Sequence, residues 1–197
     1  MELQNEHIEL LRKLVNSFGE IDTLVFDAFC ENWRLVTVGR KQILTRQGDT
    51  EKYLYIVLDG VQRAYCQHDD KEATLVFSYP VSFSGIIDSF FLQQPSRFYF
   101  ETITTSQLLR IHYNDMATLM KDHRQLETWV RIALTKTLAD TLQRQIELLA
   151  YSAEEKFTTL LQRSPHILNL IPHKYLASYI GVDPTNFSKL LGRVRLK

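Results

Sequence analysis

The side chains best suited to bind nucleic acid lie near the end of the chain, from residue 171 onward. This stretch has five Lys or Arg residues and one acidic residue, a net charge of +4, whereas the whole chain is formally neutral. Its apolar residues recur at helical spacing and predict two short helices. Gly181 stands where the first helix would end, and Asp183 can cap the second. Thr185 and Lys189 then fall on the polar face of the second helix, as in a helix-turn-helix that reads the DNA major groove. An ordinary helical hairpin with a solvated basic face would show the same pattern.

A second group of residues could bind an anion. Between residues 83 and 97, Gly85 opens a short helical turn and Arg97 closes the loop. Backbone N–H groups at the start of a helix, together with an arginine, can hold a phosphate or a carboxylate. Any β-rich fold also needs loops, so an ordinary connection between strands is the alternative interpretation.

The remaining residues that could bind a metal or react chemically are scattered along the sequence. Cys30 and Cys66 are isolated, and the histidines form no cluster with the spacing of a metal site. We therefore expect no metal, no iron–sulfur cluster and no enzymatic activity. No apolar run approaches the ~20 residues that span a bilayer, and the charged, amphipathic N-terminus is unlike a secretory signal. These features favour a protein of the reducing cytoplasm that has no membrane partner.

Secondary-structure patterns place the candidate residues in a mixed fold. Residues 5–31 are predicted to be helical, with a break at Phe18-Gly19. Residues 33–111 instead show short runs of β-branched and aromatic residues, separated by turn pairs such as Asp59-Gly60. This alternation is typical of a sandwich or barrel. The expected strands cover residues 34–38, 42–46, 53–58, 61–66, 73–79, 98–103 and 107–112.

Helical periodicity returns after residue 114, and a long apolar stripe runs from Trp129 to Leu149. A helix of this length needs a partner along its stripe. We predict that the partner is the same helix of a second copy, because proteins that read paired DNA half-sites are usually dimers. Packing of the stripe on the chain's own strands is the alternative. The residues expected at the dimer seam are Leu134, Leu138, Thr141, Leu142, Gln145 and Leu149.

The order of these segments resembles that of the Crp/Fnr (catabolite activator protein) family of bacterial transcription regulators. The resemblance covers essentially the whole chain, and its most specific pieces are Gly39, Gly48-Asp49, Tyr55, Gly60 and the run LASYIGVDPTNFSKLL. The run that begins SAEEKFTTLL resembles a branch common in Bacteroidetes. The family implies an α+β fold: a cyclic-nucleotide-binding-type β-roll (a double-stranded jelly roll), a long dimerisation helix and a C-terminal helix-turn-helix domain. The corresponding ranges here are 1–122, 123–151 and 152–197.

The resemblance also assigns roles near the C-terminus. Contacts to base edges fall on Pro184, Thr185 and Lys189, and the Lys189 ammonium suits the O6 and N7 acceptors of guanine. Proline cannot make a polar base contact through its side chain, so the base preference should differ from that of the best-known members. Only residues 163–170 separate the preceding predicted helix from this region. This short connection leaves little room for the β-hairpin wing of many members. The full set of expected DNA contacts is His173, Lys174, Pro184, Thr185, Asn186, Ser188, Lys189 and Arg193.

The loop at residues 83–97 departs from the family pattern. Members that bind cyclic AMP carry a Gly-Glu pair, whose Glu holds the ribose, and later an Arg-Ser or Arg-Thr pair, whose Arg holds the phosphate. Here Ile86 follows Gly85, and the later pair is inverted to Ser96-Arg97. A buried, unpaired ribose hydroxyl would cost about 1–3 kcal/mol. We therefore expect that cyclic AMP does not bind and that no cofactor is present. A degenerate site with an unknown, more apolar effector would comprise Gly85, Ile86, Ser96, Arg97 and Thr141.

These observations predict a homodimeric, sequence-specific transcription regulator that binds double-stranded DNA, with RNA polymerase as a further candidate partner. The alternative is a ligand-sensing β-roll module whose helical C-terminus contacts another protein. Salt dependence separates the two, because binding to phosphates weakens steeply as the salt concentration rises.

Overall fold

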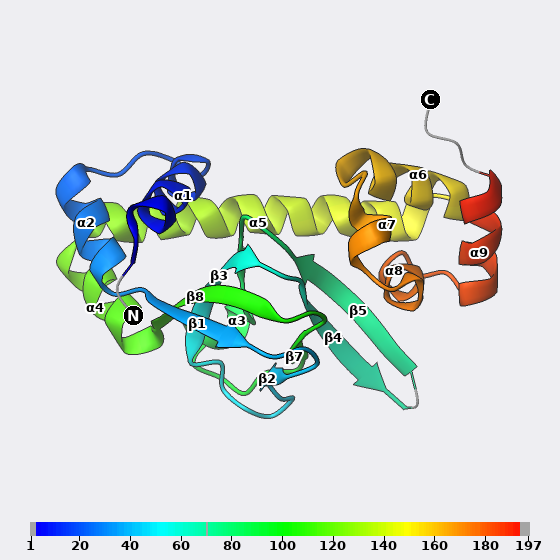
Figure 1. Cartoon of the computed structure of the whole chain (residues 1–197), viewed down its shortest axis with the longest axis horizontal. Coiled ribbons are helices and arrows are strands. Elements are labelled where there is room, and N and C mark those ends of the chain that lie inside the picture. The colour runs from blue at the N-terminus through cyan, green and yellow to red at the C-terminus, as the bar shows by residue number, and fades with distance from the viewer. Residues whose placement is uncertain (1–2, 70, 194–197) are drawn as a thin grey trace.

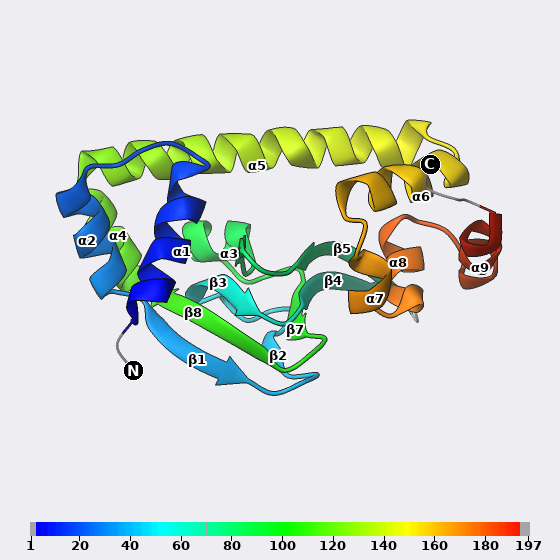
Figure 2. The same cartoon turned by 45° about the horizontal axis from the view of Figure 1, so that its top comes forward.

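The computed structural model describes residues 3–69 and 71–193 of the 197-residue chain. A sheet-rich body and a C-terminal helical lobe are bridged by one long helix, α5 (Arg124–Ala150), as Figure 1 shows. The view turned by 45° shows α5 running along one side of the whole molecule, past the sheets and on to the lobe (Figure 2). This is the α+β architecture that the sequence predicts.

The body is a β-sandwich of two four-stranded antiparallel sheets, with strand orders β1-β8-β3-β6 and β2-β7-β4-β5. Alternation along β3 sends Tyr55 and Val57 between the two sheets, and Leu54 and Ile56 toward the helices. The strands are β1 (Arg34–Val38), β2 (Ile43–Thr45), β3 (Tyr53–Asp59), β4 (Gln62–His68), β5 (Lys71–Ser78), β6 (Ser82–Ser84), β7 (Tyr99–Thr102) and β8 (Ser106–His112).

Two elements were missed by the sequence analysis. Strand β6 pairs with β3, but its three residues are too few for an alternating pattern to be visible. Helix α7 (Ile167–Leu170) is a single turn inside the connection at residues 163–170. The second half of that connection is therefore a short helix.

Helices close the outer face of the first sheet. α1 (Asn5–Asn16), α2 (Thr23–Glu31), α4 (Tyr113–Asp122) and the first turns of α5 share one core with β3 and β8. The indole N–H of Trp129 donates a hydrogen bond to the carbonyl oxygen of Val15 at 3.0 Å. This contact ties the start of α5 to α1. The predicted break at Phe18-Gly19 lies between α1 and α2 and is confirmed.

The middle and the end of α5 present an apolar face to solvent. Leu138, Leu142, Ile146 and Leu149 are 58%, 52%, 53% and 80% exposed. Neither view shows a described helix or strand over the outer edge of the middle of α5 (Figures 1 and 2). Leu134, in contrast, packs against the core of the sandwich. The first part of the stripe is therefore used within the chain, and the later part is left without a partner in the described chain.

The C-terminal lobe is built around a second apolar core, which also includes Val61, Phe77 and Ile103 of the sandwich. The lobe consists of α6 (Ala153–Arg163), α7, α8 (His173–Tyr179) and α9 (Pro184–Arg193), which bury Phe157, Leu176 and Phe187 together. Gly181 adopts a φ of +66° between α8 and α9. Asp183 Oδ1 accepts a hydrogen bond from the Asn186 N–H at 2.9 Å. The turn glycine and the capping aspartate predicted from the sequence are both confirmed.

Candidate nucleic-acid interface and ligand site

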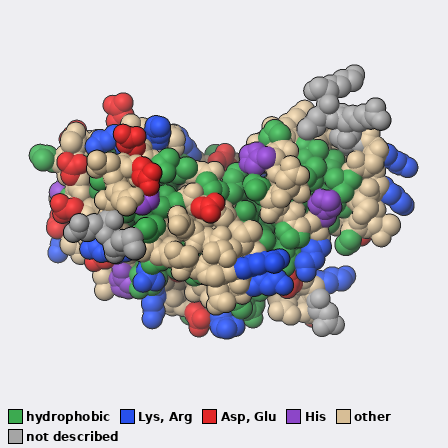
Figure 3. All heavy atoms as spheres, viewed as in Figure 1, with side chains coloured by type: hydrophobic (Ala, Val, Ile, Leu, Met, Phe, Trp, Pro, Cys, Tyr) green, Lys and Arg blue, Asp and Glu red, His purple; other side chains and the backbone are tan. Residues whose placement is uncertain are grey.

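The polar face of α9 is exposed at the far end of the molecule from α1 and α2. Thr185, Ser188, Lys189 and Arg193 are exposed, whereas Phe187 is 1% exposed and anchors the helix in the lobe. Lys and Arg side chains project outward from this end (Figure 3). The major groove of DNA admits one α-helix, and hydroxyl and ammonium groups can bond base edges there.

Of the other four predicted DNA contacts, three lie on or beside this face and one does not. Pro184 is the exposed first residue of α9, and Asn186 is half-buried. The ring of His173, at the start of α8, lies 5.7 Å from the Phe187 ring, so His173 sits beside α9. Lys174 instead faces the sandwich, where it shares a cavity of about 110 Å³ with Arg40 and Lys41.

A buried cation holds the lobe against the sandwich. Arg63 on β4 is 2% exposed, and its guanidinium donates to Glu101 and to Glu72 at 2.6 Å each. The guanidinium carbon lies 4.1 Å from the centroid of the Tyr65 ring and 3.8 Å from that of Tyr175. Because Tyr175 belongs to α8, one charged group joins β4 to the lobe through stacking on an aromatic ring.

Strand β5 adds direct hydrogen bonds to the same junction. The Thr74 N–H donates to Ser178 Oγ at 2.9 Å, and that hydroxyl donates to the Glu72 carbonyl oxygen at 3.0 Å. The rings of Phe77 and Tyr179 are 5.1 Å apart. Helix α8 is therefore fixed to an edge strand of the second sheet, and its orientation is set by named contacts.

The last turns of α5 also contact the lobe, through ion pairs and stacking. Glu147 is 3% exposed and lies 2.6 Å from Arg163 and 3.8 Å from Arg144. Burial raises the pKa of Glu147, but the hydrogen bond from Arg163 and the charges of both arginines outweigh it and lower the pKa overall. Arg144 also stacks on the Tyr179 ring, 3.7 Å from its centroid, and donates to the Tyr179 carbonyl oxygen.

The residues predicted for a degenerate ligand site are only partly brought together. Gly85 and Thr141 line one cavity between the sandwich and α5. Ile86 is 3% exposed in the core between the two sheets. Ser96 Oγ bonds the backbone of residue 98, accepting from its N–H and donating to its carbonyl. The Arg97 side chain is 77% exposed and 3.4 Å from Asp88.

A buried carboxylate lies beside Gly85 and Ile86, and sequence reasoning missed it. Glu51 is 1% exposed and accepts hydrogen bonds from the Thr45 hydroxyl at 2.7 Å and the Tyr53 N–H at 3.2 Å. The Ile86 N–H also points to Glu51, at 3.5 Å. Burial raises the pKa of Glu51, and these hydrogen bonds offset the rise only in part. An acid at this place disfavours an anionic ligand.

The residues that form the lobe junction were also missed. Arg63 falls inside a predicted strand. A charged residue at such a position is the one sign in the sequence that it could be buried and paired. Its partner Glu101 lies directly opposite on β7, a pairing between distant residues that only the register reveals. Tyr175 lies in the first of the two predicted C-terminal helices, and nothing in the local sequence indicates its contact with Arg63.

The comparisons with known proteins agree with this arrangement. Residues 35–123 match the family profile described as "Cyclic nucleotide-binding domain". No curated protein sequence matches the chain.

Solved structures share the fold of nearly the whole chain. FixK2 from Bradyrhizobium japonicum superposes with a TM-score of 0.72 at 15% identity, covering 82% of this chain and 83% of that one. The catabolite activator protein of Thermus thermophilus gives a TM-score of 0.57 at 21% identity, with coverages of 91% and 89%. A protein from Eubacterium rectale assigned to the Crp/Fnr family of transcriptional regulators gives 0.68 at 17% identity, with coverages of 90% and 88%. The likeness establishes the fold: cyclic-nucleotide-binding-type sheets followed by a C-terminal helical region.

Replacing the buried cation tests the junction. Arg63→Met should lower the free energy of unfolding by about 3 kcal/mol, because removing one partner of a buried ion pair leaves a carboxylate unpaired. Urea denaturation measures the change. Arg46→Met, at an exposed arginine, is the matched control and should change the stability by less than about 0.5 kcal/mol. Equal effects of the two substitutions would contradict the assigned role of Arg63.

The raised pKa of Glu51 predicts a pH dependence. The folded state binds this proton more tightly than the unfolded state, so stability is lost as the pH rises from the unfolded-state pKa to the folded pKa, and the loss is complete above the folded pKa. Stability should therefore fall as the pH rises from about 4.5 through the folded pKa. Glu51→Gln should remove this decline, and it should gain stability relative to the parent protein between pH 4.5 and pH 8 in thermal melts. Glu127→Gln, at an exposed position on α5, is the control and should run parallel to the parent.

Proposed function

We propose that this chain is a homodimeric, sequence-specific DNA-binding transcription regulator of the Crp/Fnr type. The observation that carries the proposal is the exposed polar and basic face of α9, presented at the end of the molecule by a lobe that is fixed to the sandwich. In this proposal α8 and α9 are the two helices of a helix-turn-helix, and α9 is the recognition helix. The fold shared with Crp/Fnr regulators supports the assignment.

The proposed roles on this surface follow from side-chain chemistry. Lys189 contacts a guanine, and Thr185 contacts a base through its hydroxyl or methyl group. Ser188, Arg193, Asn186 and His173 contact phosphates and set the register on the duplex. Pro184 shapes the start of α9 without a polar base contact. Lys174, which faces Arg40 and Lys41, belongs to a basic rim beside the recognition helix.

The dimer in this proposal forms through α5. Leu138, Leu142 and Leu149, with Ile146 as an addition to the predicted set, supply the apolar seam, and Thr141 and Gln145 lie beside it. Knobs-into-holes packing of two such helices would cover this face. Leu134 contributes at its edge only, because its side chain already packs on the sandwich core.

No enzymatic role is proposed. Within residues 3–69 and 71–193, no three His, Cys, Asp or Glu residues are grouped so that they could hold a metal ion. The described helices include none that is long and apolar enough to cross a membrane. RNA polymerase remains a candidate partner, and cyclic AMP is not proposed as the effector.

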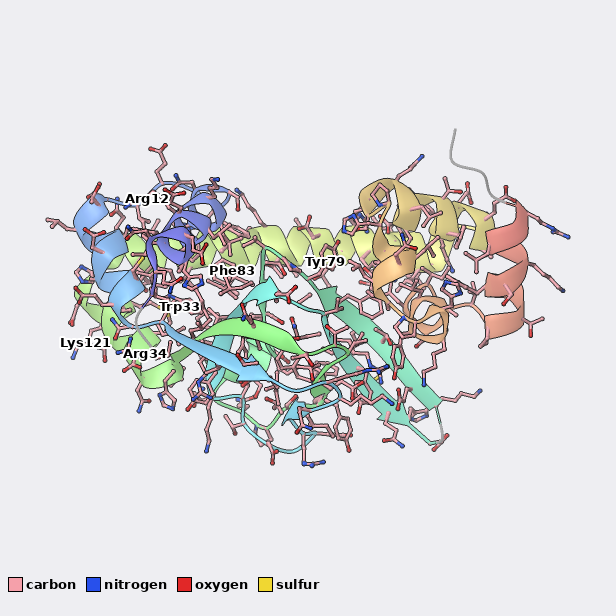
Figure 4. The ribbon with its side chains drawn as sticks, viewed as in Figure 1. Arg12, Trp33, Arg34, Tyr79, Phe83 and Lys121 are labelled. Atoms are coloured by element: carbon pink, nitrogen blue, oxygen red, sulfur yellow. The ribbon has the colours of Figure 1, made fainter. Side chains whose placement is uncertain are left out.

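The recognition residue can be tested on DNA sites selected from random sequence. Lys189→Ala should lose about 1–3 kcal/mol of discrimination at one base position, because a cationic side chain pairs with guanine acceptors. Competitive gel-shift assays with sites mutated at single positions measure this loss. Lys121→Ala, at the opposite end of the molecule (Figure 4), should bind like the parent protein. Binding that is insensitive to salt would favour the alternative function, in which the lobe contacts another protein.

The proposed dimer seam can be tested by measuring the mass of the protein in solution. Leu142→Asp places a charge in the proposed apolar contact and should convert the dimer to a monomer at micromolar concentration, as sedimentation velocity would show. Leu92→Asp is the matched control, since Leu92 is 64% exposed on α3 (Ile87–Leu92) and is not part of the proposed seam. A parent protein that is monomeric would refute the homodimer.

A further inference from the structure

A small cleft lies where the sandwich meets the C-terminal lobe, and we call it the junction cleft. It has a volume of about 110 Å³, and its walls come from the turn between β1 and β2, the end of β7 and the start of α8. Three of the residues that line it carry a positive charge: Arg40 and Lys41 on the turn, and Lys174 on α8. Figure 3 shows Lys and Arg side chains gathered on the face where the two parts of the molecule meet.

Hydrogen bonds fix the sandwich side of the junction cleft. The Lys41 N–H donates to the Thr102 carbonyl oxygen at 2.9 Å, and Thr102 Oγ1 donates to the Gly39 carbonyl oxygen at 2.6 Å. Arg40 Nε donates to the Ile103 carbonyl oxygen at 3.3 Å, which lays the guanidinium along the wall of the cleft. The terminal nitrogens of Arg40 have no partner within the described chain, so both can donate to an oxyanion in the forked geometry that arginine provides.

The lobe side supplies a cation of its own. Lys174 is exposed, and its Nζ lies 4.7 Å from the centroid of the Tyr175 ring. Among the described residues of the lining, Glu101 is the one acid, and it already accepts a hydrogen bond from Arg63 at 2.6 Å. Arg63 also pairs with Glu72. The cleft and this cluster together hold four cations and two carboxylates, a net charge of +2.

The three cations of the junction cleft lack a counter-charge of their own. Within residues 3–69 and 71–193, neither Arg40, Lys41 nor Lys174 forms an ion pair. Like charges around one space repel one another, and a bound anion removes that repulsion. The volume of the cleft equals that of about four water molecules in the liquid, which suits one tetrahedral oxyanion.

We propose that the junction cleft binds the phosphoryl group of a small phosphoanion, a phosphate monoester or a diphosphate, between Arg40 of the sandwich and Lys174 of the lobe. A dianion matches the net charge of +2, and arginine and lysine are the side chains that bind phosphate groups. The bound anion would join the sandwich to the lobe beside the Arg63 contact. Its binding does not depend on the proposed function, whereas any effect on DNA binding does.

The binding test uses the whole chain without DNA, in a chloride buffer of fixed ionic strength. Titration calorimetry with pyrophosphate and with inorganic phosphate should show a single site per chain, and both anions should raise the melting temperature. Acetate should bind at least about tenfold more weakly, because a monoanion satisfies fewer of the cations. Failure of both phosphoanions to bind, or equal binding of acetate, would overturn the proposal.

Four single variants locate the site. Arg40→Gln and Lys174→Gln change exposed residues on different parts of the molecule, and each should weaken pyrophosphate at least about tenfold, the value of one charge-assisted hydrogen bond. Arg46→Gln, at an exposed arginine just after β2, and Lys189→Gln, on α9, remove the same charge elsewhere and should bind pyrophosphate like the parent. A loss in only one of the two cleft variants would refute a bridge between sandwich and lobe. A loss in Lys189→Gln alone would place the anion on α9 and overturn the proposal.

DNA duplexes of increasing length distinguish a small anion from a phosphate of the DNA backbone. Arg40→Gln should weaken pyrophosphate and should bind long and short duplexes in the same ratio as the parent. If Arg40→Gln instead keeps pyrophosphate binding and loses affinity for long duplexes only, the cleft contacts DNA and the proposal fails. A parent protein that binds pyrophosphate but no DNA would refute only the proposed function.

Discussion

The position of the C-terminal lobe depends on one buried guanidinium. A charge inside a protein is tolerated only when it is paired and hydrogen-bonded, and Arg63 meets this condition with two carboxylates and two aromatic rings. Three of these partners lie in the sandwich, but Tyr175 belongs to α8. Any movement of the lobe away from β4 would expose one face of the cation and remove its stacking partner. The direction in which α9 presents its polar face therefore depends in part on Arg63, which acts with the β5 hydrogen bonds and the Arg163–Glu147 ion pair to position the lobe.

Strand β5 connects this junction to the cavity between the sandwich and α5. Thr74 bonds Ser178 of α8, while Val76 and Ser78, a few residues further on, line the cavity. The ladder between β4 and β5 shifts its register here, because Leu75 is an extra residue on the β5 side. Bulges of this kind bend a strand and redirect its side chains. One short strand therefore contacts a helix of the lobe at one end and lines the cavity at the other.

The sequence revealed the local features of this fold and missed the distant pairings. Gly181 and Asp183 identify the turn between α8 and α9 because backbone conformation and capping are local properties. The β-branched and aromatic runs identify seven of the eight strands for the same reason. Arg63 and Glu101 could not be paired from the sequence, since their contact depends on the register of β4 against β7. Glu51 follows a turn pair and would be expected in solvent; it is buried because Thr45 and the start of α3 close over it.

Near the end of α5 a charged side chain is buried and an apolar side chain is exposed, which is the reverse of what these residue types favour. Glu147 is 3% exposed, while Leu149, two residues on, is 80% exposed. The buried acid is paired with Arg163 and Arg144, and the apolar side chains on the other side of this helix segment face outward. Fully burying a leucine side chain is worth about 1.5–3 kcal/mol, so a row of exposed ones favours a second apolar surface. If that surface is the same helix related by a two-fold axis along α5, both lobes lie at one end of the assembly. Two α9 helices would then face one side, as two half-sites on a single DNA duplex require.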